Sequence, residues 1–288
     1  MLDRPSDRAL LIDPIPFVKM HGIGNDYVYL DEREVEVDVR AAPRWARRFA
    51  DRQRGVGGDG LIILRRGTDP AVRMEMYNAD GSRSAMCGNG LRCVAYLAHR
   101  RGYSTSREFS IATDVGARRA IVAAQPSSDG STWVEVDMGR PRIGSTREEL
   151  RAGDTRAFGS VVEVGNPHFV IEIESALDSY PVAHDGALFE RHARFATGAN
   201  IEFVRVESRE QIALRVWERG SGETLACGSG ATAAVAVLAQ LGRVDRRVRV
   251  RLPGGELTVV IADDGAATLA GPVAVSFVGA CARELVAV

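Results

Sequence analysis

Cys87-Gly88-Asn89-Gly90 and Cys227-Gly228-Ser229-Gly230 are two copies of one motif, and they lie 140 positions apart (227 − 87) in a chain of 288 residues. One Cys-Gly-X-Gly turn is a weak signal, but other landmarks recur at nearly the same offset. Gly24-Asn25 returns as Gly165-Asn166 at 141 positions (166 − 25), and Gly58–Ile63 lines up with Gly198–Phe203 at 140 (198 − 58). Such self-similarity predicts a duplicated half-chain.

The sequence around both motifs predicts the same order of elements. Val72–Tyr77 and Ile212–Trp217 alternate between apolar and polar residues as strands do, and each precedes a polar loop and the cysteine turn. Apolar segments then run over 91–101 and 231–241 and stop at Gly102 and Gly242, which are typical helix C-caps. The second segment is apolar almost all round, as is a helix enclosed by a strongly curved sheet.

Short strands fill much of the remaining chain, so we predict two similar α+β halves, each wrapping strands around one helix. The stretch Pro141–Asp154, rich in Gly, Arg and Glu, is interpreted as the linker region. The additional strands are predicted over Phe109–Thr113, Ala120–Ala124, Trp133–Asp137, Val248–Leu252, Glu256–Ile261 and Val273–Val278.

The composition excludes several classes of protein. Lys and Arg together number 37 against 38 Asp and Glu, and 45% of the residues are hydrophobic, which argues against disorder, nucleic-acid binding and a membrane surface. Four dispersed cysteines do not make a secreted disulfide framework, and the N-terminus lacks the pattern of a signal peptide. We therefore expect a cytoplasmic protein with reduced thiols.

Each motif places a cysteine where a predicted buried helix begins. Helix N-termini carry unpaired N–H groups and partial positive charge, which favour thiolates and bound carboxylates. If the halves face each other about a pseudo-twofold axis, Cys87 and Cys227 flank one ligand from opposite sides. That arrangement suits proton removal from one face of a carbon and return to the other, the chemistry of a cofactor-independent racemase or epimerase.

Pyridoxal, metal, Cys–His and redox chemistry are the alternatives. A pyridoxal enzyme needs a Schiff-base lysine, and Lys19 is the only lysine in the chain. The five histidines and four cysteines show no metal-ligand spacing, so no metal is expected. Nucleophilic Cys–His catalysis through His168 or His21 leaves the second cysteine unexplained, and a redox disulfide between Cys87 and Cys227 remains an alternative.

The cysteines, histidines and other polar residues outside the two motifs have either structural or ligand-binding roles. Cys93 and Cys281 are interpreted as small buried hydrophobes. The remaining histidines are interpreted as surface or packing residues: His99, His184 and His192. Asparagines beside glycines or at the ends of apolar runs are either turn residues or ligand amides, and their repeat-related positions favour ligand amides: Asn25, Asn78, Asn166 and Asn200. Glu218-Arg219, just ahead of the second motif, can bind a zwitterionic group.

At these residues the chain resembles diaminopimelate epimerase, an enzyme of lysine and cell-wall precursor synthesis in bacteria. The resemblance runs from Phe17 to about Gly271 and rests on several long motifs in the same order: Met20–Asp26, Gly55–Gly60, Tyr77–Ser82, Cys87–Cys93, Gly165–His168, Glu218–Thr224 and Ala226–Gly230. Proline racemases are similar in fold and in using two cysteines, but their sequences around those cysteines differ from these.

The resemblance implies an α+β fold of two pseudo-symmetric domains, each a curved, mostly antiparallel sheet around a central helix. The final strand, near Val273–Val278, is expected to cross back to the first half. The N-terminal half-domain, with Cys87, is therefore expected over 1–137 plus 272–288, and the C-terminal half-domain, with Cys227, over 138–271. A homodimer is also implied.

For function, the resemblance implies a pyridoxal-independent, two-base interconversion of LL- and meso-2,6-diaminopimelate. Cys227 is then the proton acceptor and Cys87 the donor in the LL to meso direction. The substrate is expected to contact Asn25, Asn78, Asn166, Asn200, Glu218 and Arg219, with its reacting carboxylate on the backbone N–H groups of Gly88, Asn89, Gly228 and Ser229, and His168 in support.

One departure and two rival functions accompany this reading. Gly60 stands where some relatives carry a substrate-contacting glutamine, so Gly60 is left out of the predicted site. A racemase for another amino acid could be built on the same scaffold, although Arg219, Glu218 and the asparagines favour a substrate with a second zwitterionic head. A redox-sensing relative is the other rival. We also predict that mild oxidation inactivates the protein reversibly by pairing Cys87 with Cys227.

Overall fold

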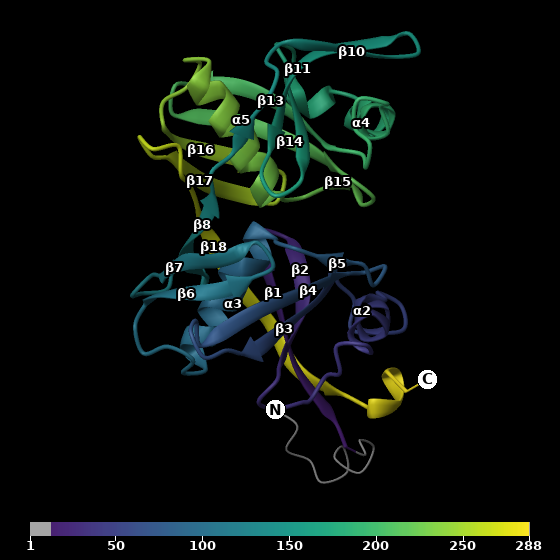
Figure 1. Ribbon diagram of the computed structural model, residues 1–288, viewed down its shortest axis with the longest axis vertical. Coiled ribbons are helices and arrows are strands. Elements are labelled where there is room, and N and C mark those ends of the chain that lie inside the picture. The colour runs from purple at the N-terminus through teal and green to yellow at the C-terminus, as the bar shows by residue number, and fades with distance from the viewer. Residues whose placement is uncertain (1–12, 288) are drawn as a thin grey trace.

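The computed structural model describes residues 13–287 and divides into two lobes stacked along the long axis (Figure 1). The expectation about a signal peptide falls on the N-terminal residues and lies largely outside this range. The α+β fold is confirmed: strands dominate, and each lobe wraps its strands around a central helix.

The first lobe begins with two strands and encloses α3. Its elements are β1 (Ile15–Gly22), β2 (Asn25–Asp31), α2 (Ala42–Ala50), β3 (Gly60–Arg66), β4 (Val72–Asn78), β5 (Arg83–Ser84), α3 (Gly88–Arg100), β6 (Glu108–Thr113) and β7 (Gly116–Val122). The second lobe encloses α5. Its elements are β9 (Arg142–Ile143), β10 (Glu148–Ala152), β11 (Thr155–Glu163), β12 (Pro167–Glu172), η1 (Leu177–Ser179), α4 (Val182–Glu190), β13 (Asn200–Ser208), β14 (Gln211–Glu218), β15 (Gly222–Thr224), α5 (Gly228–Gln240), β16 (Arg247–Leu252) and β17 (Gly255–Ile261).

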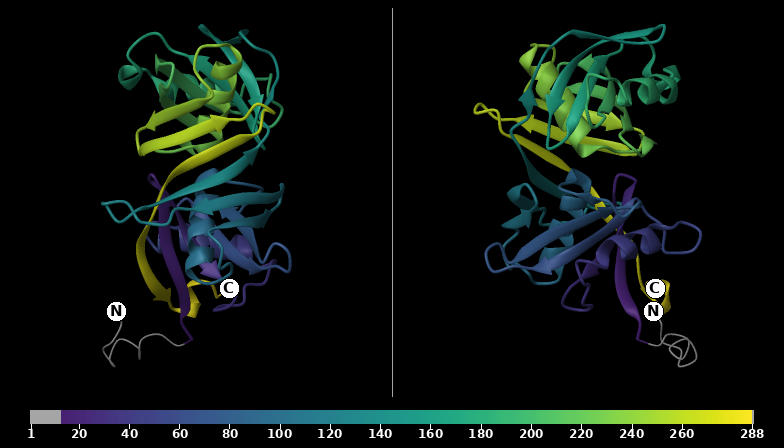
Figure 2. Two further views of the ribbon diagram at one scale, coloured as in Figure 1. Left: turned by 90° about the vertical axis from the view of Figure 1, so that its left-hand side faces the viewer. Right: turned by 45° about the vertical axis from the view of Figure 1, so that its right-hand side comes forward.

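Two long strands join the lobes. β8 (Thr132–Gly139) and β18 (Ala267–Cys281) pair antiparallel with each other, and β18 then continues beside β1 before the short turn η2 (Arg283–Leu285). Figure 2 shows β18, in yellow, running from the second lobe down the length of the first. The return of the last strand to the first lobe is therefore confirmed. The predicted domain limits, at 137/138 and 271/272, fall inside these two strands, and that division of the chain remains a prediction.

The strand pairings repeat between the lobes. β2 pairs parallel with β3, with Tyr27 opposite Gly60, and β12 pairs parallel with β13, with His168 opposite Asn200. β3 and β13 each pair antiparallel with the strand that precedes a cysteine turn, β4 and β14. The structure therefore carries the duplication that the sequence indicates, and it fixes which positions of the two lobes are equivalent.

The two central helices start earlier than predicted. They were expected over 91–101 and 231–241, but α3 begins at Gly88 and α5 at Gly228, each directly after its cysteine. The sulfur of Cys87 accepts a hydrogen bond from the Gly90 N–H, and that caps the first turn in place of the usual hydroxyl or carboxylate. Because glycine is a poor helix former, the glycines of the motif make this first turn look non-helical in the sequence.

The interpretation of Pro141–Asp154 as a linker is partly wrong. β9 and β10 lie within it, and β10 pairs antiparallel with β11, with Leu150 opposite Ala157. Leu150 is buried in a cluster with Phe169 and Phe189, while the flanking Arg and Glu side chains point to solvent. β10 is polar and has a single inward-facing apolar residue, so its alternation of apolar and polar residues is too weak to be recognised as a strand in the sequence.

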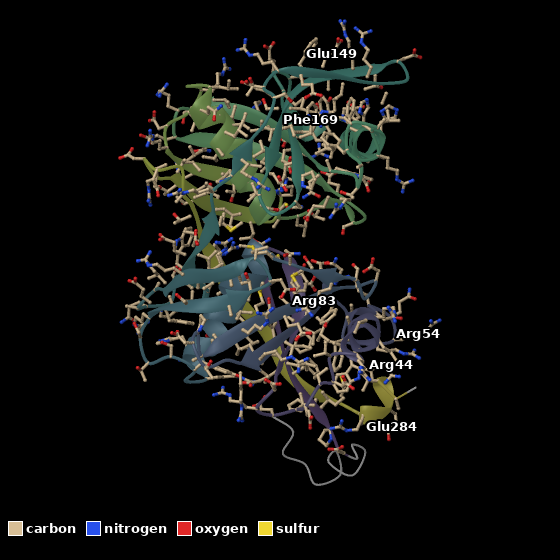
Figure 3. All side chains as sticks on the ribbon, viewed as in Figure 1. Arg44, Arg54, Arg83, Glu149, Phe169 and Glu284 are labelled. Atoms are coloured by element: carbon tan, nitrogen blue, oxygen red, sulfur yellow. The ribbon has the colours of Figure 1, made fainter. Side chains whose placement is uncertain are left out.

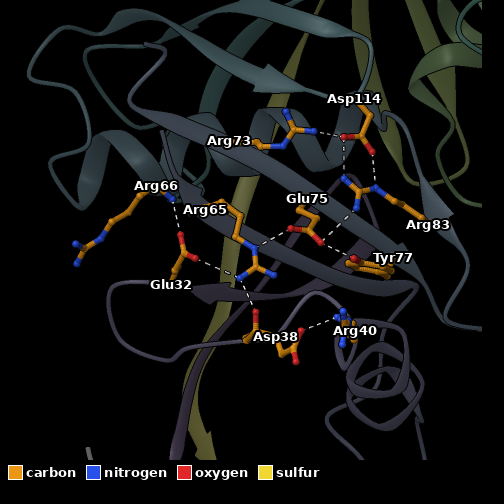
Figure 4. A network of polar contacts seen from close by, with 11 residues as sticks. Glu32, Asp38, Arg40, Arg65, Arg66, Arg73, Glu75, Tyr77, Arg83 and Asp114 are labelled. Atoms are coloured by element: carbon orange, nitrogen blue, oxygen red, sulfur yellow. Dashed lines mark hydrogen bonds and ion pairs between the residues drawn. The ribbon is translucent and has the colours of Figure 1, made fainter. Parts of the chain in front are cut away.

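Apolar side chains fill both lobes, and charged ones lie at the rim. Phe169 is fully buried in the second lobe, whereas Arg54 and Glu284 lie on the outside of the first (Figure 3). Between β3, β4 and the loop before α2, a network of charges has Arg65 and Glu75 buried at its centre (Figure 4). Arg65 Nε donates to Glu75 Oε2 at 2.7 Å, and its Nη1 donates to the Val37 carbonyl at 2.6 Å.

We expect Glu75→Ala to destabilise the protein by about 3 kcal/mol, because it removes the closer and more buried of the two carboxylates that pair with Arg65 and leaves only Glu32, at 3.3 Å. Arg65 and Glu75 are 8% and 4% exposed, so water cannot replace the lost carboxylate. Urea unfolding followed by circular dichroism measures the change. Glu108→Ala, which breaks an exposed pair with Arg119, is the control and should leave the midpoint unchanged. Equal midpoints for wild type and Glu75→Ala would contradict this account.

Candidate active site

Both cysteines of the repeated motif cap a central helix. Cys87 Sγ accepts from the Gly90 N–H and Cys227 Sγ accepts from the Gly230 N–H, each at 3.3 Å. Both sulfurs therefore lie at the positive ends of helices buried on almost every side. Cys87 is partly buried and Cys227 is 3% exposed, and both are free thiols.

The two helix N-termini meet between the lobes. A Cβ placed on Gly228 would lie 3.5 Å from the Gly88 Cα, so the first turns of α3 and α5 face each other at close range. The same Cβ would lie 2.7 Å from Leu269 Cδ2, and one on Gly88 would lie 2.8 Å from that atom. Because Leu269 of β18 is packed against both turns, neither position has room for a side chain. The first-turn N–H groups of both helices are thus brought to one place.

Asn25 lies beside Cys87. Its Oδ1 is 3.5 Å from Cys87 Sγ and accepts from Asn89 Nδ2 at 3.2 Å. Its Nδ2 donates to Asp59 Oδ2 at 2.7 Å, and Asp59 also accepts from Arg52. The carboxylate thereby fixes which way the amide points, with its oxygen toward the thiol.

Asn89 connects the two lobes. Its side-chain Nδ2 donates to Asn25 Oδ1 and also to the carbonyl of Ala226, 3.2 Å away and one residue before Cys227. The residue is 1% exposed. The sequence predicts a role only for its backbone N–H, but the side chain ties the surroundings of Cys87 to the turn that carries Cys227.

Polar side chains also surround Cys227. Ser229 Oγ lies 3.5 Å from its sulfur, and Thr224 Oγ1 donates to Glu218 Oε1 at 2.5 Å. Burial raises the pKa of Glu218 to about 6, although hydrogen bonds from Thr224 and Cys227 act to lower it. Glu218 therefore lies next to the thiol with a carboxyl group that titrates near neutral pH.

Behind Cys227 lies a buried His–Glu pair. His168 Nδ1 is 2.7 Å from Glu202 Oε1, and His168 Nε2 is 3.0 Å from Asn166 Oδ1. Both His168 and Glu202 are fully buried. Because both ring nitrogens are engaged, His168 is not free to activate a cysteine directly, and His21 uses its Nδ1 to accept from the Gly24 N–H. This geometry disfavours the Cys–His alternative.

The remaining predicted residues lie around these groups. Asn200 is buried, and its Oδ1 accepts from the Arg219 backbone N–H at 2.8 Å. The exposed Arg219 guanidinium donates to the Thr197 carbonyl at 3.1 Å, farther out. Asn78 Nδ2 donates to Ser82 Oγ at 3.0 Å, within the turn that follows β4. The structure thus brings Asn25 to Cys87, places Glu218 beside Cys227, and puts Asn78 at the end of β4 and Arg219 in the turn after β14.

Burial opposes ionisation of both thiols. It raises the pKa of Cys87, while the backbone N–H groups of Gly90 and Asn89 act to lower it. It raises the pKa of Cys227 further, with added repulsion from Glu218 and Glu202. A raised pKa makes the corresponding thiolate a stronger base, which suits it to remove a proton from a very weak carbon acid.

Sequence reasoning missed three residues of this site: Asp59, Arg92 and Glu202. Asp59 lies inside a motif quoted for the resemblance, but its contact with Asn25 joins residues 34 positions apart. Arg92 and Glu202 are fully buried charges, each in the most buried part of its helix or strand. A charge inside a predicted core segment is the signal that could have singled them out.

Other kinds of site find little support. Lys19 forms a salt bridge with Asp26 at 2.6 Å and is buried, so it is already engaged. Within residues 13–287, no three His, Cys, Asp or Glu side chains gather as metal ligands. In the same range, every helix is too short or too polar to cross a membrane.

Comparison with known proteins was made by sequence and by structure. Residues 17–144 and 160–276 match the model of the family described as diaminopimelate epimerase. The diaminopimelate epimerase of Acidiphilium cryptum is 42% identical over 274 residues, 92% of this chain and 95% of that protein, and that of Leptospira biflexa is 37% identical over 279 residues, 92% and 98%. The O-ureido-serine racemase of Streptomyces lavendulae is 42% identical over 281 residues, 92% and 94%.

Solved structures share the fold at much lower identity. A PhzF-family phenazine biosynthesis protein of Bacillus anthracis superposes with a TM-score of 0.74 at 14% identity, covering 94% of this chain and 99% of that one. A hydroxyproline epimerase of Agrobacterium vitis gives 0.72 at 13% identity, covering 94% and 92%.

Proposed function

The chain belongs to the diaminopimelate epimerase family, and from that premise we propose that it interconverts LL- and meso-2,6-diaminopimelate without pyridoxal phosphate. The observation that carries the proposal is the pair of free thiols, Cys87 and Cys227, each capping one of two buried helices whose N-termini face each other. In the LL to meso direction, Cys227 takes the α-proton and Cys87 returns one to the opposite face of the carbon.

The helix N-termini supply the electrostatic part of the reaction. Loss of the α-proton places negative charge on the substrate carboxylate, and unpaired N–H groups aimed at that carboxylate stabilise it. The groups assigned to it are the backbone N–H groups of Gly88, Asn89, Gly228 and Ser229. Because these groups are fixed in buried helices, they need no rearrangement as the charge develops.

Side chains around the thiols hold the substrate. Glu218, next to Cys227, is suited to an ammonium group, and Arg219 to a carboxylate at the distal end. The amides of Asn25, Asn78, Asn166 and Asn200 complete the proposed set, with His168 supporting Asn166. A substrate with two amino-acid heads can use both ends of this site.

A racemase of O-ureido-serine is the second candidate, because a protein of that name is as similar as the epimerase relatives. Incubation of the reduced protein with each amino acid, without added cofactor and with stereoisomers resolved by chiral chromatography, separates the two. We expect LL-diaminopimelate to give the meso isomer and O-ureido-serine to remain unchanged. Turnover of O-ureido-serine alone would overturn the proposed substrate and retain the two-thiol chemistry.

We further propose that the protein acts in the cytoplasm, in the synthesis of lysine and peptidoglycan precursors. Two reduced thiols are required by the proposed chemistry, and the cytoplasm keeps them reduced.

A homodimer is supported by the exposed half of β18. Among the described residues, 274–281 of this strand pair only with β1, which leaves the opposite edge without a partner. Val275, Phe277 and Val278 on this stretch are 41%, 48% and 69% exposed. An apolar free edge is a template for pairing with a second chain. We propose that a second copy of this protein covers it.

Phe277→Asp is expected to weaken the dimer at least ~30-fold, since an aromatic interface residue commonly contributes about 2 kcal/mol or more. Sedimentation velocity over a range of protein concentrations measures the dissociation constant. Phe158→Asp, at an equally exposed aromatic on the second lobe, is the control and should leave it unchanged. A wild-type protein that stays monomeric, or a Phe277→Asp variant as dimeric as wild type, would refute this interface.

A further inference from the structure

The duplicated halves differ in charge at equivalent positions behind the two cysteines. The offset of 140 that relates Cys87 to Cys227 also relates Arg92 to Thr232 and Ile62 to Glu202. The contacts agree with this equivalence. Ile62 Cδ1 lies 2.6 Å from a Cβ built on Gly90, and Glu202 Oε1 lies 2.8 Å from one built on Gly230. One half thus carries an arginine whose guanidinium bonds Asn89, the residue that shares Asn25 Oδ1 with Cys87, and the other half carries a carboxylate beside Gly230, whose N–H donates to Cys227 Sγ.

Arg92 is a buried cation with no acidic partner in the described part of the chain. It is fully buried, its Nη2 donates to Asn89 Oδ1 at 2.8 Å, and its Nη1 lies 3.4 Å from the Gly88 carbonyl. Its Nε has no hydrogen-bond partner within the described residues. An arginine keeps its proton even there, and an uncompensated buried charge is costly. Thr232, its equivalent, only donates its hydroxyl to the Gly228 carbonyl at 2.8 Å.

Glu202 is the opposite charge in the other half. It is fully buried, one oxygen contacts His168, and the other has no hydrogen-bond partner within residues 13–287. Its carboxylate repels a thiolate on Cys227 and contributes to the raised pKa of that thiol.

Other titratable groups also face the thiols. Cys87 lies near Tyr27, Tyr29, Cys93 and Arg92, and Cys227 lies near Glu202, which contacts His168. Glu218 acts on both thiols. Tyr27 and Tyr29 stay neutral, because burial raises the pKa of each phenol well above its usual range. The charged side chains that differ between the two sites are Arg92, on the helix that Cys87 caps, and Glu202 with its partner His168 in the other half.

We propose that Arg92 and Glu202 are positioning residues that polarise the thiol pair, placing the thiolate of the free protein on Cys87 and keeping the proton on Cys227. The proposal rests on the proposed function and adds a direction to it. A thiolate on Cys87 is the form that removes a proton from the meso isomer. The Cys227 thiol then gives its proton to the other face of the carbon, which leaves Cys87 protonated and Cys227 as the thiolate.

The test is the pH dependence of alkylation at each cysteine, measured with iodoacetamide and quantified by mass spectrometry of the separate peptides. The midpoint of each rate profile reports thiolate formation and does not depend on how accessible the sulfur is. We expect the Cys87 midpoint to lie more than one pH unit below that of Cys227. Arg92→Met should raise the Cys87 midpoint by at least one unit, and Glu202→Gln should lower that of Cys227.

Matched variants separate charge from packing. Thr232→Val alters the position equivalent to Arg92 without changing its charge, so it should move neither midpoint. Arg92→Lys keeps the positive charge, so the Cys87 midpoint should stay at its wild-type value. Replacing a buried charge with a hydrophobic residue of similar volume is often neutral or stabilising, so Arg92→Met is expected to fold. If Arg92→Met does not fold, the proposal is still tested by the order of the two midpoints in the wild-type protein and by the shift of the Cys227 midpoint in Glu202→Gln.

A Cys227 midpoint at or below that of Cys87 would overturn the proposal, as would a folded Arg92→Met variant with an unchanged Cys87 profile. No substrate enters the measurement. A failure of this proposal is therefore distinguishable from a failure to epimerise diaminopimelate.

Discussion

Cys227→Ala and Cys87→Ala are each expected to lose at least ~10³-fold in kcat for epimerisation, because a two-base mechanism cannot complete a turnover with either base missing and each positioned base contributes up to about 10⁴-fold. The structure gives neither thiol a substitute. The imidazole of His168 is held by Glu202 and Asn166. Chiral chromatography of the product mixture measures the loss.

Cys281→Ala is the control for this pair, since Cys281 is a free thiol at the far end of β18 and packs against the cluster around α2. It should keep wild-type kcat. Circular dichroism checks that the inactive variants are folded. An alanine variant at position 87 or 227 that retained a tenth of the wild-type rate would refute the two-base mechanism.

Glu218→Gln is expected to lower kcat/KM by about 100-fold, since truncating one partner of a buried charge pair costs 2–5 kcal/mol. The carboxyl must be ionised to bind an ammonium group, and its pKa is raised to about 6. The wild-type kcat/KM should therefore fall as the pH drops below about 6, when Glu218 takes up a proton. A glutamine cannot titrate, so the variant should lose that dependence.

Glu223→Gln is the matched control, because Glu223 lies on β15, which pairs with the end of β14 that carries Glu218, but bonds Arg215 at 2.7 Å. It should retain both the wild-type kcat/KM and its acid limb. If Glu218→Gln kept the same fall below pH 6, another group would be responsible for it and this role of Glu218 would be wrong.

The features that repeat could be predicted from sequence. The two Cys-Gly-X-Gly motifs, the strands before them and the helices after them recur in order, and the structure confirms those strands and helices with small shifts at their ends. The facing of the two cysteine turns follows from a duplicated chain with a pseudo-twofold axis. The contact of Asn89 with the Ala226 carbonyl does not, because it depends on how closely the lobes approach.

α2 and α4 also lie 140 positions apart (182 − 42), but both helices were missed in the sequence, for different reasons. α2 carries a usable signal: Pro43 lies in its first turn, and Trp45 and Phe49, four residues apart, are both buried. α4 carries almost none, because it starts without a side-chain cap and contains a glycine in its middle, Gly186. Gly186 is there because a side chain would collide with Trp217, a contact that only the folded chain reveals.

Charge in the site was the least predictable feature. Arg92 lies two residues after Gly90 in a segment that predicts only a buried helix, and Glu202 interrupts a buried strand. The effect of each charge on the thiol pKa values depends on which thiol it lies near. That difference becomes visible only when equivalent positions of the two halves are compared.

In the proposed mechanism two thiols act on opposite faces of one carbon. The most direct test is hydrogen exchange during turnover in D₂O. With LL-diaminopimelate and the wild-type protein, NMR at early times should show one deuterium at the inverted α-carbon of the meso product, while recovered substrate stays unlabelled. The base that removes the proton differs from the acid that delivers the deuteron. Recovered substrate that gains deuterium as fast as product forms would show a single base at work and would contradict the account.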